Sequence, residues 1–286
     1  MAESKSVLNS GTFSLGTTTV HRLGFGAMRL TGRGVWGEPT DRAECVKVLR
    51  RAVELGVDFI DTADSYGPYV SEDLIRESLH PYPSNLVIAT KAGLTRTGPN
   101  EWHAVGRAEY LRQEVEMSLR RLGVDALDLF QLHRVDPKVP AEEQFGLLAD
   151  VLREGKVKNI GLSNVSVDQL RQARDVVPVV SVQNLYNLTD RSSEDVLKYC
   201  ESENIGFIPW FPIAAGRLAS PGGPVAEIAK ETGGTAAQIS LAWLLAKSPV
   251  ILPIPGTSSV GHLEENCAAA DVQLTTSQVE RLSAAA

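Results

Sequence analysis

The alternation of short apolar segments with amphipathic runs is the feature that most restricts how this chain can fold. From residue 22 onward, each short apolar segment is followed by a run with helical periodicity, and this unit occurs eight times. Strands that alternate with helices in this way are typical of parallel βαβ units. The predicted strands are Arg22–Gly26, Val57–Ile60, Leu86–Thr90, Ala126–Gln131, Val157–Leu162, Val179–Gln183, Gly206–Pro209 and Val250–Pro253.

The helical runs and the chain length together favour a closed barrel. The predicted helices span about residues 41–55, 71–79, 107–122, 140–154, 166–175, 191–203, 223–246 (broken near 233–234), 259–269 and 275–283. No linker or low-complexity tract interrupts the sequence, so we expect one domain over residues 1–286. Eight βα units in one domain favour an α/β fold of the (β/α)8 (TIM) barrel type over an open doubly wound sheet. Thr12–Leu15 and Thr18–Val20 predict an N-terminal β-hairpin that caps one end of the barrel.

The composition argues against several classes of protein. The net charge is -7, and Lys and Arg are spread along the chain, which disfavours binding to nucleic acid or to an anionic membrane surface. Cys45, Cys200 and Cys267 stand far apart and no His lies at metal-ligand spacing, so we expect neither disulfides nor a metal site. The N-terminus lacks a signal peptide's apolar region, and no apolar run approaches the roughly 20 residues of a membrane span. We therefore expect a soluble, cytoplasmic protein.

Titratable side chains follow the predicted strands at their carboxyl ends, where barrel enzymes place their reacting groups. Asp61 follows the second strand, Lys91 the third and His133 the fourth. Tyr66 lies in the loop after the second strand. Taken singly, Asp61 is compatible with a helix cap, Lys91 with a solvated charge and His133 with a core residue. Their occurrence on successive strands favours a shared site for proton transfer.

The chemistry of these four side chains suits protonation of an oxygen atom. A free tyrosine has a pKa of roughly 10, which is too high for an efficient proton donor near neutrality. A nearby Lys91 ammonium lowers the pKa of Tyr66 because it favours the phenolate, and a buried Asp61 keeps that lysine charged and oriented. His133 then steers a carbonyl oxygen toward the phenol. We predict a site that protonates a carbonyl oxygen while another group delivers hydride to the carbon.

With these residues in place, the chain resembles the aldo-keto reductase family over nearly its whole length. The motifs that carry the resemblance are Asp61-Thr-Ala-Asp-Ser-Tyr66-Gly, Ala89-Thr-Lys91, Leu132-His133, Gly161-Leu-Ser-Asn164 and Gln183-Asn184, in the family's order. The resemblance implies an NAD(P)H-dependent carbonyl reductase in which Tyr66 is the general acid. It also implies an extended cofactor across the barrel mouth without a Rossmann domain. Consistently, Gly24-Phe-Gly26 lacks the third glycine of a dinucleotide fingerprint.

The resemblance assigns residues to the nicotinamide half of the cofactor. Ser163, Asn164 and Gln183 are expected to hydrogen-bond the carboxamide, and Trp210 is expected to stack on the ring. Ser163 and Asn164 are also compatible with a simple helix start, and Trp210 with a core residue. A loop over the pyrophosphate supplies further candidates, although Phe211 replaces the family's serine. The complete set for this half is Met28, Ser163, Asn164, Gln183, Trp210, Phe211, Pro212 and Arg217.

The adenosine half is expected after the eighth strand. The resemblance places there Gly256, Thr257, Ser258, Ser259, His262, Glu265 and Asn266. Many members grip the 2′-phosphate with a Lys and an Arg, where this chain has Gly256 and His262. NADPH is the expected cofactor, with hydroxyl and backbone donors in place of charge, and NADH is the alternative. Ser258 and Ser259 are equally compatible with helix N-caps.

Two long loops, Thr31–Thr40 and Ala92–Gly106, lie on the predicted active face. With the second-strand loop, they supply Trp36, Tyr69, Trp102 and His103. Together with Met28 and Trp210, these residues are expected to form an aromatic wall for a flat or apolar aldehyde. Packing of the loops on one another is the alternative for these residues.

The expected partner is a small-molecule carbonyl substrate. Gly34-Val-Trp-Gly-Glu, Asp64-Ser-Tyr-Gly-Pro and Leu252-Pro-Ile-Pro-Gly-Thr-Ser-Ser resemble a bacterial subgroup that includes pyridoxal reductases, which makes pyridoxal the first substrate to test. The rival is a nucleotide-binding regulatory or redox-sensing subunit with little turnover, like the potassium-channel β-subunits of the family. A barrel lyase or isomerase would need a metal or phosphate-substrate site that the sequence does not offer. The sequence does not indicate the oligomeric state.

Overall fold

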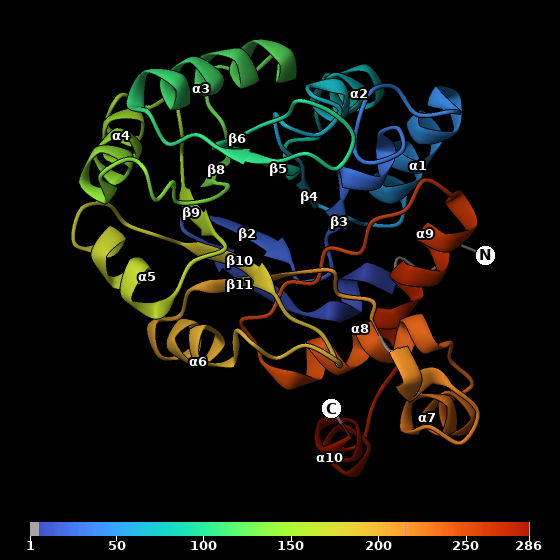
Figure 1. Cartoon of the computed structure of the whole chain (residues 1–286). Coiled ribbons are helices and arrows are strands. Elements are labelled where there is room, and N and C mark those ends of the chain that lie inside the picture. The colour runs from blue at the N-terminus through green and yellow to red at the C-terminus, as the bar shows by residue number, and fades with distance from the viewer. Residues whose placement is uncertain (1–5, 215, 286) are drawn as a thin grey trace.

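Parallel strands in the centre of the molecule form a barrel that is surrounded by helices (Figure 1). The computed structural model describes residues 6–214 and 216–285. A seven-stranded sheet runs in the order β11-β10-β9-β8-β5-β4-β3. The bounds of its strands are β3 Phe25–Gly26, β4 Phe59–Asp61, β5 Val87–Ala92, β8 Leu129–Leu132, β9 Ile160–Ser163, β10 Ser181–Leu185 and β11 Gly206–Trp210. All neighbours in this sheet pair in parallel, which confirms the (β/α)8 barrel expected from the alternation.

The eighth predicted strand, Val250–Pro253, is not a regular strand. Only Ile251 forms a β-bridge, to β11. The carbonyls of Pro253 and Pro255 accept backbone hydrogen bonds of 2.9 and 3.3 Å from the segment around β3. The segment therefore closes the barrel between β11 and β3. Proline has no N–H to donate, so a regular ladder cannot continue through this segment.

The predicted helices are confirmed, including the break after Thr232. There, Gly233 adopts a left-handed backbone with φ of 75°, which ends one helix before the next begins. None of the described helices is long and apolar enough to cross a membrane. The α-helices are α1 Arg42–Glu54, α2 Val70–Leu79, α3 Ala108–Leu122, α4 Ala141–Arg153, α5 Val167–Arg174, α6 Glu194–Glu203, α7 Pro224–Thr232, α8 Ala236–Lys247, α9 Val260–Cys267 and α10 Thr276–Ala284. Short 3-10 helices are η1 Ser6–Ser10, η2 Ala27–Leu30, η3 Gly216–Ala219 and η4 Ala268–Asp271.

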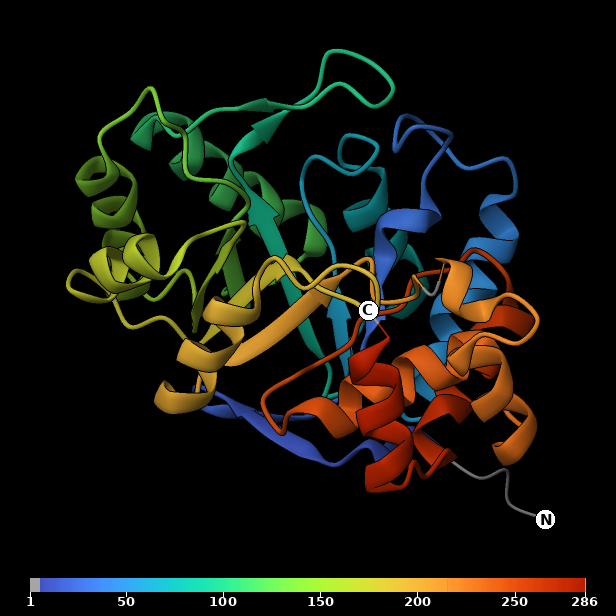
Figure 2. The same ribbon diagram turned by 60° about the horizontal axis from the view of Figure 1, so that its bottom comes forward.

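The two ends of the barrel are covered differently. The predicted hairpin, β1 (Thr12–Leu15) with β2 (Thr18–His21), lies across the amino-terminal ends of the strands, at the bottom of Figure 2. It packs so closely that a Cβ on Gly206, the first residue of β11, would lie 2.9 Å from a methyl carbon of Leu15. At the opposite end, loop 92–106 contains an unpredicted antiparallel pair, β6 (Leu94–Thr95) and β7 (His103–Ala104). The hairpin thus leaves the carboxyl ends free for a site.

Candidate active site

The four titratable side chains from the sequence converge at the carboxyl ends of β4, β5 and β8, which are neighbours in the sheet. Asp61 ends β4, Lys91 lies one residue before the end of β5, and His133 directly follows β8. Tyr66 lies in the loop after β4 and brings its hydroxyl back to Lys91. All four side chains belong to buried residues. Parallel strands in adjacent positions therefore bring together groups that are far apart in the sequence.

The Lys91 ammonium is held by three oxygen atoms. Its Nζ lies 2.5 Å from Asp61 Oδ1, 2.8 Å from the carbonyl of Thr62 and 3.3 Å from the hydroxyl of Tyr66. The ion pair with Asp61 is shielded from water, since the two side chains are 0% and 2% exposed. An ammonium has three donors, so each is used. One of the three is directed at the phenol.

Burial and charge act in opposite directions on Lys91 and Tyr66. Burial lowers the pKa of Lys91, but the attraction of Asp61 and Tyr66 outweighs it and raises that pKa above its ordinary value. Burial raises the pKa of Tyr66, and the lowering effect of Lys91 is smaller, so the net pKa lies above 10.0. The prediction of a lowered Tyr66 pKa is therefore wrong, because it omitted the desolvation of the phenolate. At neutral pH Tyr66 is a neutral phenol, which still carries the proton that a donor needs.

The imidazole of His133 is uncharged at neutral pH. Burial lowers the pKa of His133 well below its ordinary value, and three nearby cations add to that effect. The Ser65 hydroxyl lies 3.3 Å from Nδ1 of the ring, and in the tautomer in which this hydroxyl donates, the ring carries its proton on Nε2. The ring meets Tyr66 edge-on, with 5.9 Å between centroids. A neutral imidazole with a proton on Nε2 can donate a hydrogen bond to an oxygen beside the phenol.

Two buried glutamines hold the second oxygen of Asp61. Gln131 and Gln183 donate to Asp61 Oδ2 at 2.8 and 2.9 Å. Gln131 is not among the predicted site residues, although a fully buried polar residue within the apolar strand β8 is a usable signal. Gln183, which was expected to contact the cofactor, is bonded to Asp61 in this structure. With Lys91 on Oδ1 and these amides on Oδ2, both carboxylate oxygens of Asp61 have hydrogen-bond donors.

A cavity of about 760 Å³ opens beside these groups, a volume that suits a small-molecule site. Lys91 contacts Tyr66 and Asp61 but does not line the cavity. Among the described residues, no group of three or more His, Cys, Asp and Glu side chains could hold a metal ion. The predicted residues that line the cavity are Met28, Asp61, Tyr66, Trp102, His133, Ser163, Asn164, Gln183, Trp210, Phe211, Pro212 and Gly256.

Asn164 connects three parts of the cavity wall. Its backbone is left-handed, with φ of 57°, which asparagine tolerates better than most residues. Its Nδ2 donates to Ser163 Oγ at 2.9 Å and to the carbonyl of His133 at 3.2 Å. Its Oδ1 accepts a hydrogen bond of 3.1 Å from the indole of Trp210. Three of the predicted nicotinamide residues, Ser163, Asn164 and Trp210, therefore form one connected group beside His133.

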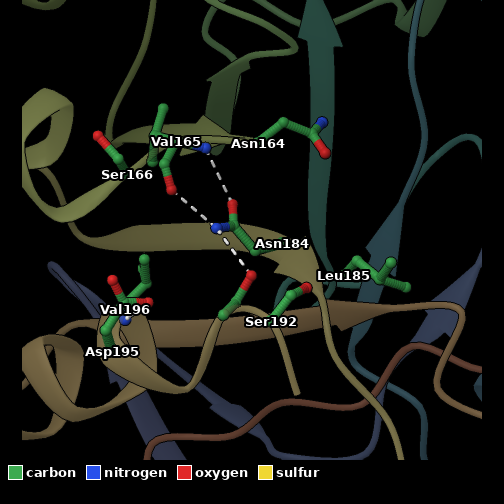
Figure 3. Close-up of a pocket in the computed structure, with 9 residues that line it drawn as sticks. Asn164, Val165, Ser166, Asn184, Leu185, Ser192, Asp195 and Val196 are labelled. Carbon is green, nitrogen blue, oxygen red and sulfur yellow. Dashed lines mark hydrogen bonds between the residues drawn. The ribbon is translucent and has the colours of Figure 1, made fainter. Parts of the chain in front are cut away.

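Asn184 anchors the loop that carries this group. Its Oδ1 accepts from the amide of Val165 at 3.1 Å, and its Nδ2 donates to the carbonyl of Val165 at 2.8 Å, as Figure 3 shows. The same Nδ2 donates to the hydroxyl of Ser193 at 3.3 Å. Asn164 borders both the pocket of Figure 3, about 360 Å³ in volume, and the larger cavity. Asn184 therefore supports the site without lining the larger cavity.

The serines predicted for the adenosine end lie at the start of α9. Ser259 accepts from the amide of His262 and caps this helix, which is the alternative considered from the sequence. The hydroxyl of Thr257 accepts from the amide of Ser259 at 3.1 Å. Ser258 and His262 are exposed. The side chains of Thr257 and Ser259 thus have local partners, whereas those of Ser258 and His262 face solvent.

The remaining predicted residues of the cofactor end are scattered. Glu265 accepts a hydrogen bond of 2.6 Å from the hydroxyl of Thr235, and Asn266 is buried. Within the part of the chain that the structure describes, only Gly256 of the adenosine group lines the cavity. Arg217 belongs to η3, and its side chain lies outside the described part of the chain.

Two arginines that were not predicted line the cavity. Arg29 and Arg134 are exposed, and neither has a hydrogen-bond or ion-pair partner among residues 6–214 and 216–285. Arg29 lies beside Gly256, where an added Cβ would be 3.6 Å from Cγ of Arg29. Both arginines come shortly after the end of a strand, and this position could have identified them from the sequence. An unpaired guanidinium favours an anionic ligand.

Of the predicted aromatic wall, Met28, Trp102 and Trp210 line the cavity, whereas Trp36, Tyr69 and His103 do not. Tyr69 is 42% exposed, and its ring faces the guanidinium of Arg121 at 4.1 Å instead. It precedes α2 with a left-handed backbone, φ of 71°, which the sequence did not reveal. His103 is exposed and Trp36 is partly buried, and neither reaches the cavity lining of the described residues.

Comparisons with known proteins agree with this geometry. A model of the aldo/keto reductase family matches residues 22–286. An uncharacterized oxidoreductase of Schizosaccharomyces pombe is 55% identical over 273 residues, which cover 96% of this chain and 89% of that protein. The pyridoxine 4-dehydrogenase of Escherichia coli is 42% identical over 274 residues, with 94% and 96% covered. An aldo-keto reductase of Klebsiella pneumoniae, crystallised with NADPH, has a TM-score of 0.78 and 27% identity, with 93% and 91% covered. The chain therefore belongs to the aldo/keto reductase family and is an NAD(P)H-dependent oxidoreductase.

Proposed function

We propose that this protein reduces an aldehyde or ketone to an alcohol, with NADPH as hydride donor and Tyr66 as proton donor. The observation that carries the proposal is the contact of 3.3 Å between the Tyr66 hydroxyl and the ammonium of Lys91, which is itself paired with Asp61. Tyr66 lines the cavity, so a carbonyl compound has access to its hydroxyl. The overall reaction converts the carbonyl compound, NADPH and a proton into the alcohol and NADP+.

The cavity lining fits a nicotinamide nucleotide. Ser163, Asn164 and Gln183 offer a hydroxyl group and amide oxygens that can accept from the N–H groups of a carboxamide, and Trp210 offers an aromatic face. Arg29, which has no partner among the described residues, suits a phosphate. NADPH, when bound, supplies the hydride to the carbonyl carbon. The Klebsiella relative crystallised with NADPH supports the choice of this cofactor.

The protein's own residues handle the proton. Tyr66 gives its phenolic proton to the carbonyl oxygen, and the Lys91 ammonium stabilises the phenolate that remains. Asp61 keeps that ammonium charged within the buried site. His133, which is uncharged, donates a hydrogen bond to the same carbonyl oxygen and directs it toward the phenol. Proton donation from a neutral phenol is compatible with the raised pKa of Tyr66, since the phenol stays protonated until needed.

The proposed substrates are aromatic aldehydes, with pyridoxal as the first to test. Met28, Trp102 and Trp210 give the cavity flat or apolar surfaces that suit an aromatic ring. The relative from Escherichia coli is named for its action on pyridoxine, the alcohol that corresponds to pyridoxal.

The experiment follows NADPH oxidation at 340 nm with pyridoxal and a panel of aromatic and aliphatic aldehydes. We expect turnover with at least one aromatic aldehyde, and a lower KM for NADPH than for NADH. A tenfold preference for NADH would overturn the cofactor choice. Tight NADPH binding without turnover of any carbonyl would contradict the proposal and favour a regulatory, redox-sensing role.

A further inference from the structure

Arg96 ties together the loops that frame the cavity. It follows β6 in loop 92–106, and each of its nitrogen donors meets a backbone carbonyl. A guanidinium has five N–H donors, so its hydrogen-bonding capacity is fully used. The acceptors are the carbonyls of Glu101 (2.7 Å from Nε), Val35 and Ser65 (2.7 and 2.9 Å from Nη1), and Gly34 and Gly98 (2.8 and 3.2 Å from Nη2).

These carbonyls come from three separate segments. Gly34 and Val35 belong to loop 31–40, Ser65 directly precedes Tyr66, and the other two belong to the loop of Arg96 itself. No carboxylate pairs with Arg96 within residues 6–214 and 216–285, so its side chain acts as a bridge between backbones. Lysine cannot replace it, since a lysine ammonium is a point charge with three donors and lacks the planar fork of arginine.

The bridge supports a strained backbone in loop 31–40. Val35 has φ of 56°, which is unfavourable for a β-branched residue. Its carbonyl accepts from Arg96 and from the amide of Gly67. The two loops are also in direct contact, because a Cβ on Gly34 would lie 2.7 Å from Cβ of Pro99. Such a conformation persists where the surrounding structure holds it, and it often occurs at functional sites.

The flat face of Arg96 fixes an aromatic side chain over the reacting groups. The guanidinium carbon lies 3.6 Å from the centroid of the Trp102 ring and 5.8 Å from that of Trp36. Trp102 in turn meets Tyr66 and His133 edge-on, with centroid distances of 6.4 and 6.3 Å. Trp102 thus lies next to the proposed proton donor, and its contact with Arg96 fixes the position of its indole ring.

We propose that Arg96 is a positioning residue that fixes Trp102 as the aromatic wall of the substrate site and so selects flat aromatic aldehydes. This inference rests on the proposed function. An indole that is already fixed can contact a substrate ring without losing further conformational freedom, and this preorganisation strengthens binding. Arg96 does not bind the carbonyl oxygen, since its five donors are occupied by the protein.

The test compares 4-nitrobenzaldehyde, which is flat, with butanal, which is not, in wild type and Arg96→Met. We expect kcat/KM for the aromatic aldehyde to fall at least tenfold and that for butanal to fall less than threefold. Arg96→Lys should behave like Arg96→Met, and it provides the same comparison if the methionine variant does not fold. Equal losses for the two aldehydes in a folded variant, or no loss, would overturn the inference.

Two further variants separate positioning from general stability. Arg22 is a matched control, because its guanidinium also bonds to backbone carbonyls, those of Ile251, Ser10, Leu245 and Ser248, at the amino-terminal side of β3. Arg22→Met should lower the melting temperature yet keep the ratio of aromatic to aliphatic kcat/KM within twofold. Adding Arg96→Met to Trp102→Leu should change that ratio little, since both act through the same indole. Additive effects would overturn the inference.

A binding measurement keeps the inference independent of turnover. Benzyl alcohol, which cannot be reduced as a carbonyl, is titrated into wild type and Arg96→Met while tryptophan fluorescence is followed. We expect the Kd of the variant to be at least tenfold higher. A wild type that reduces no aldehyde would contradict the proposed function alone, whereas an equal Kd in both proteins, or no binding to wild type, would overturn the role of Arg96.

Discussion

The buried pair of Lys91 and Asp61 offers a quantitative test of the site's electrostatics. The charged atoms are 2.5 Å apart and both side chains are almost fully buried. At an effective dielectric constant of about 20, the Coulomb attraction at this distance is about 7 kcal/mol, and desolvation of both charges offsets much of it. Asp61→Asn leaves the ammonium buried without a counter-charge, because its remaining partners, which include the carbonyl of Thr62 and the hydroxyl of Tyr66, are neutral oxygens. We expect a loss of about 3–5 kcal/mol in the free energy of unfolding, the usual cost of an unpaired buried charge.

The pH dependence of this loss has a definite sign. In wild type the pKa of Lys91 is raised above 10.5, so the pair stabilises the protein fully below that pH and less as the pH rises through the folded-state pKa. Without Asp61, burial lowers the pKa of Lys91 below its unfolded value, so the deficit of Asp61→Asn should shrink as the pH rises.

Urea unfolding of wild type, Asp61→Asn, Lys91→Met and the double variant measures these free energies. The double variant has no unpaired buried charge, and we expect it to recover at least half of the loss of Asp61→Asn. A loss below about 1 kcal/mol for Asp61→Asn would refute this account of the pair, because exposed pairs typically contribute no more than that. A double variant as unstable as Asp61→Asn would refute it too.

Three further predictions concern single features of the site. The rate of carbonyl reduction should stay constant from about pH 6 to 9 and fall only above 10. The reason is that the pKa of Tyr66 is raised above 10.0, whereas that of His133 lies well below its ordinary value. A step in the rate near pH 6.5 would contradict this prediction. Gln131→Met should lower kcat by roughly 5- to 150-fold, the equivalent of about 1–3 kcal/mol, because it removes a hydrogen-bond donor to the buried Asp61 carboxylate. The Kd of NADPH should change less. Steady-state kinetics measure the first effect and a cofactor titration the second. Arg29→Gln should raise the Kd of NADPH about tenfold and leave kcat within threefold, and an unchanged Kd measured by cofactor fluorescence would show that Arg29 does not contact the nucleotide.

The barrel and its reacting end were predictable because both depend on local order in the sequence. Helices and strands alternate in the chain, and parallel connections place every strand's carboxyl end on one side. Asp61, Lys91 and His133 could therefore be brought together without knowledge of their distances. The prediction of a regular eighth strand was wrong because Pro253 and Pro255 have no N–H group to donate to a β-ladder. The segment still occupies the position of that strand in the barrel.

What could not be predicted depends on burial and on contacts between loops. The direction of the Tyr66 pKa required the extent of its desolvation, which no motif reports. Arg96 lies in a loop without a recognisable pattern, and its partners are carbonyls, which every residue has. Tyr69 was placed with the pocket because of its sequence neighbours, yet its left-handed backbone and its contact with Arg121 take it to the surface.

The central claim is that Tyr66 gives the proton to the carbonyl oxygen. Its most direct test is the single-turnover rate of NADPH oxidation at 340 nm by wild type and by Tyr66→Phe, with the best aromatic aldehyde and saturating cofactor. Positioned acids accelerate proton transfer by about 10²–10⁴-fold, so we predict a loss of that size in the variant with an unchanged Kd for NADPH. A Tyr66→Phe protein that binds NADPH normally and retains the wild-type rate would contradict the account.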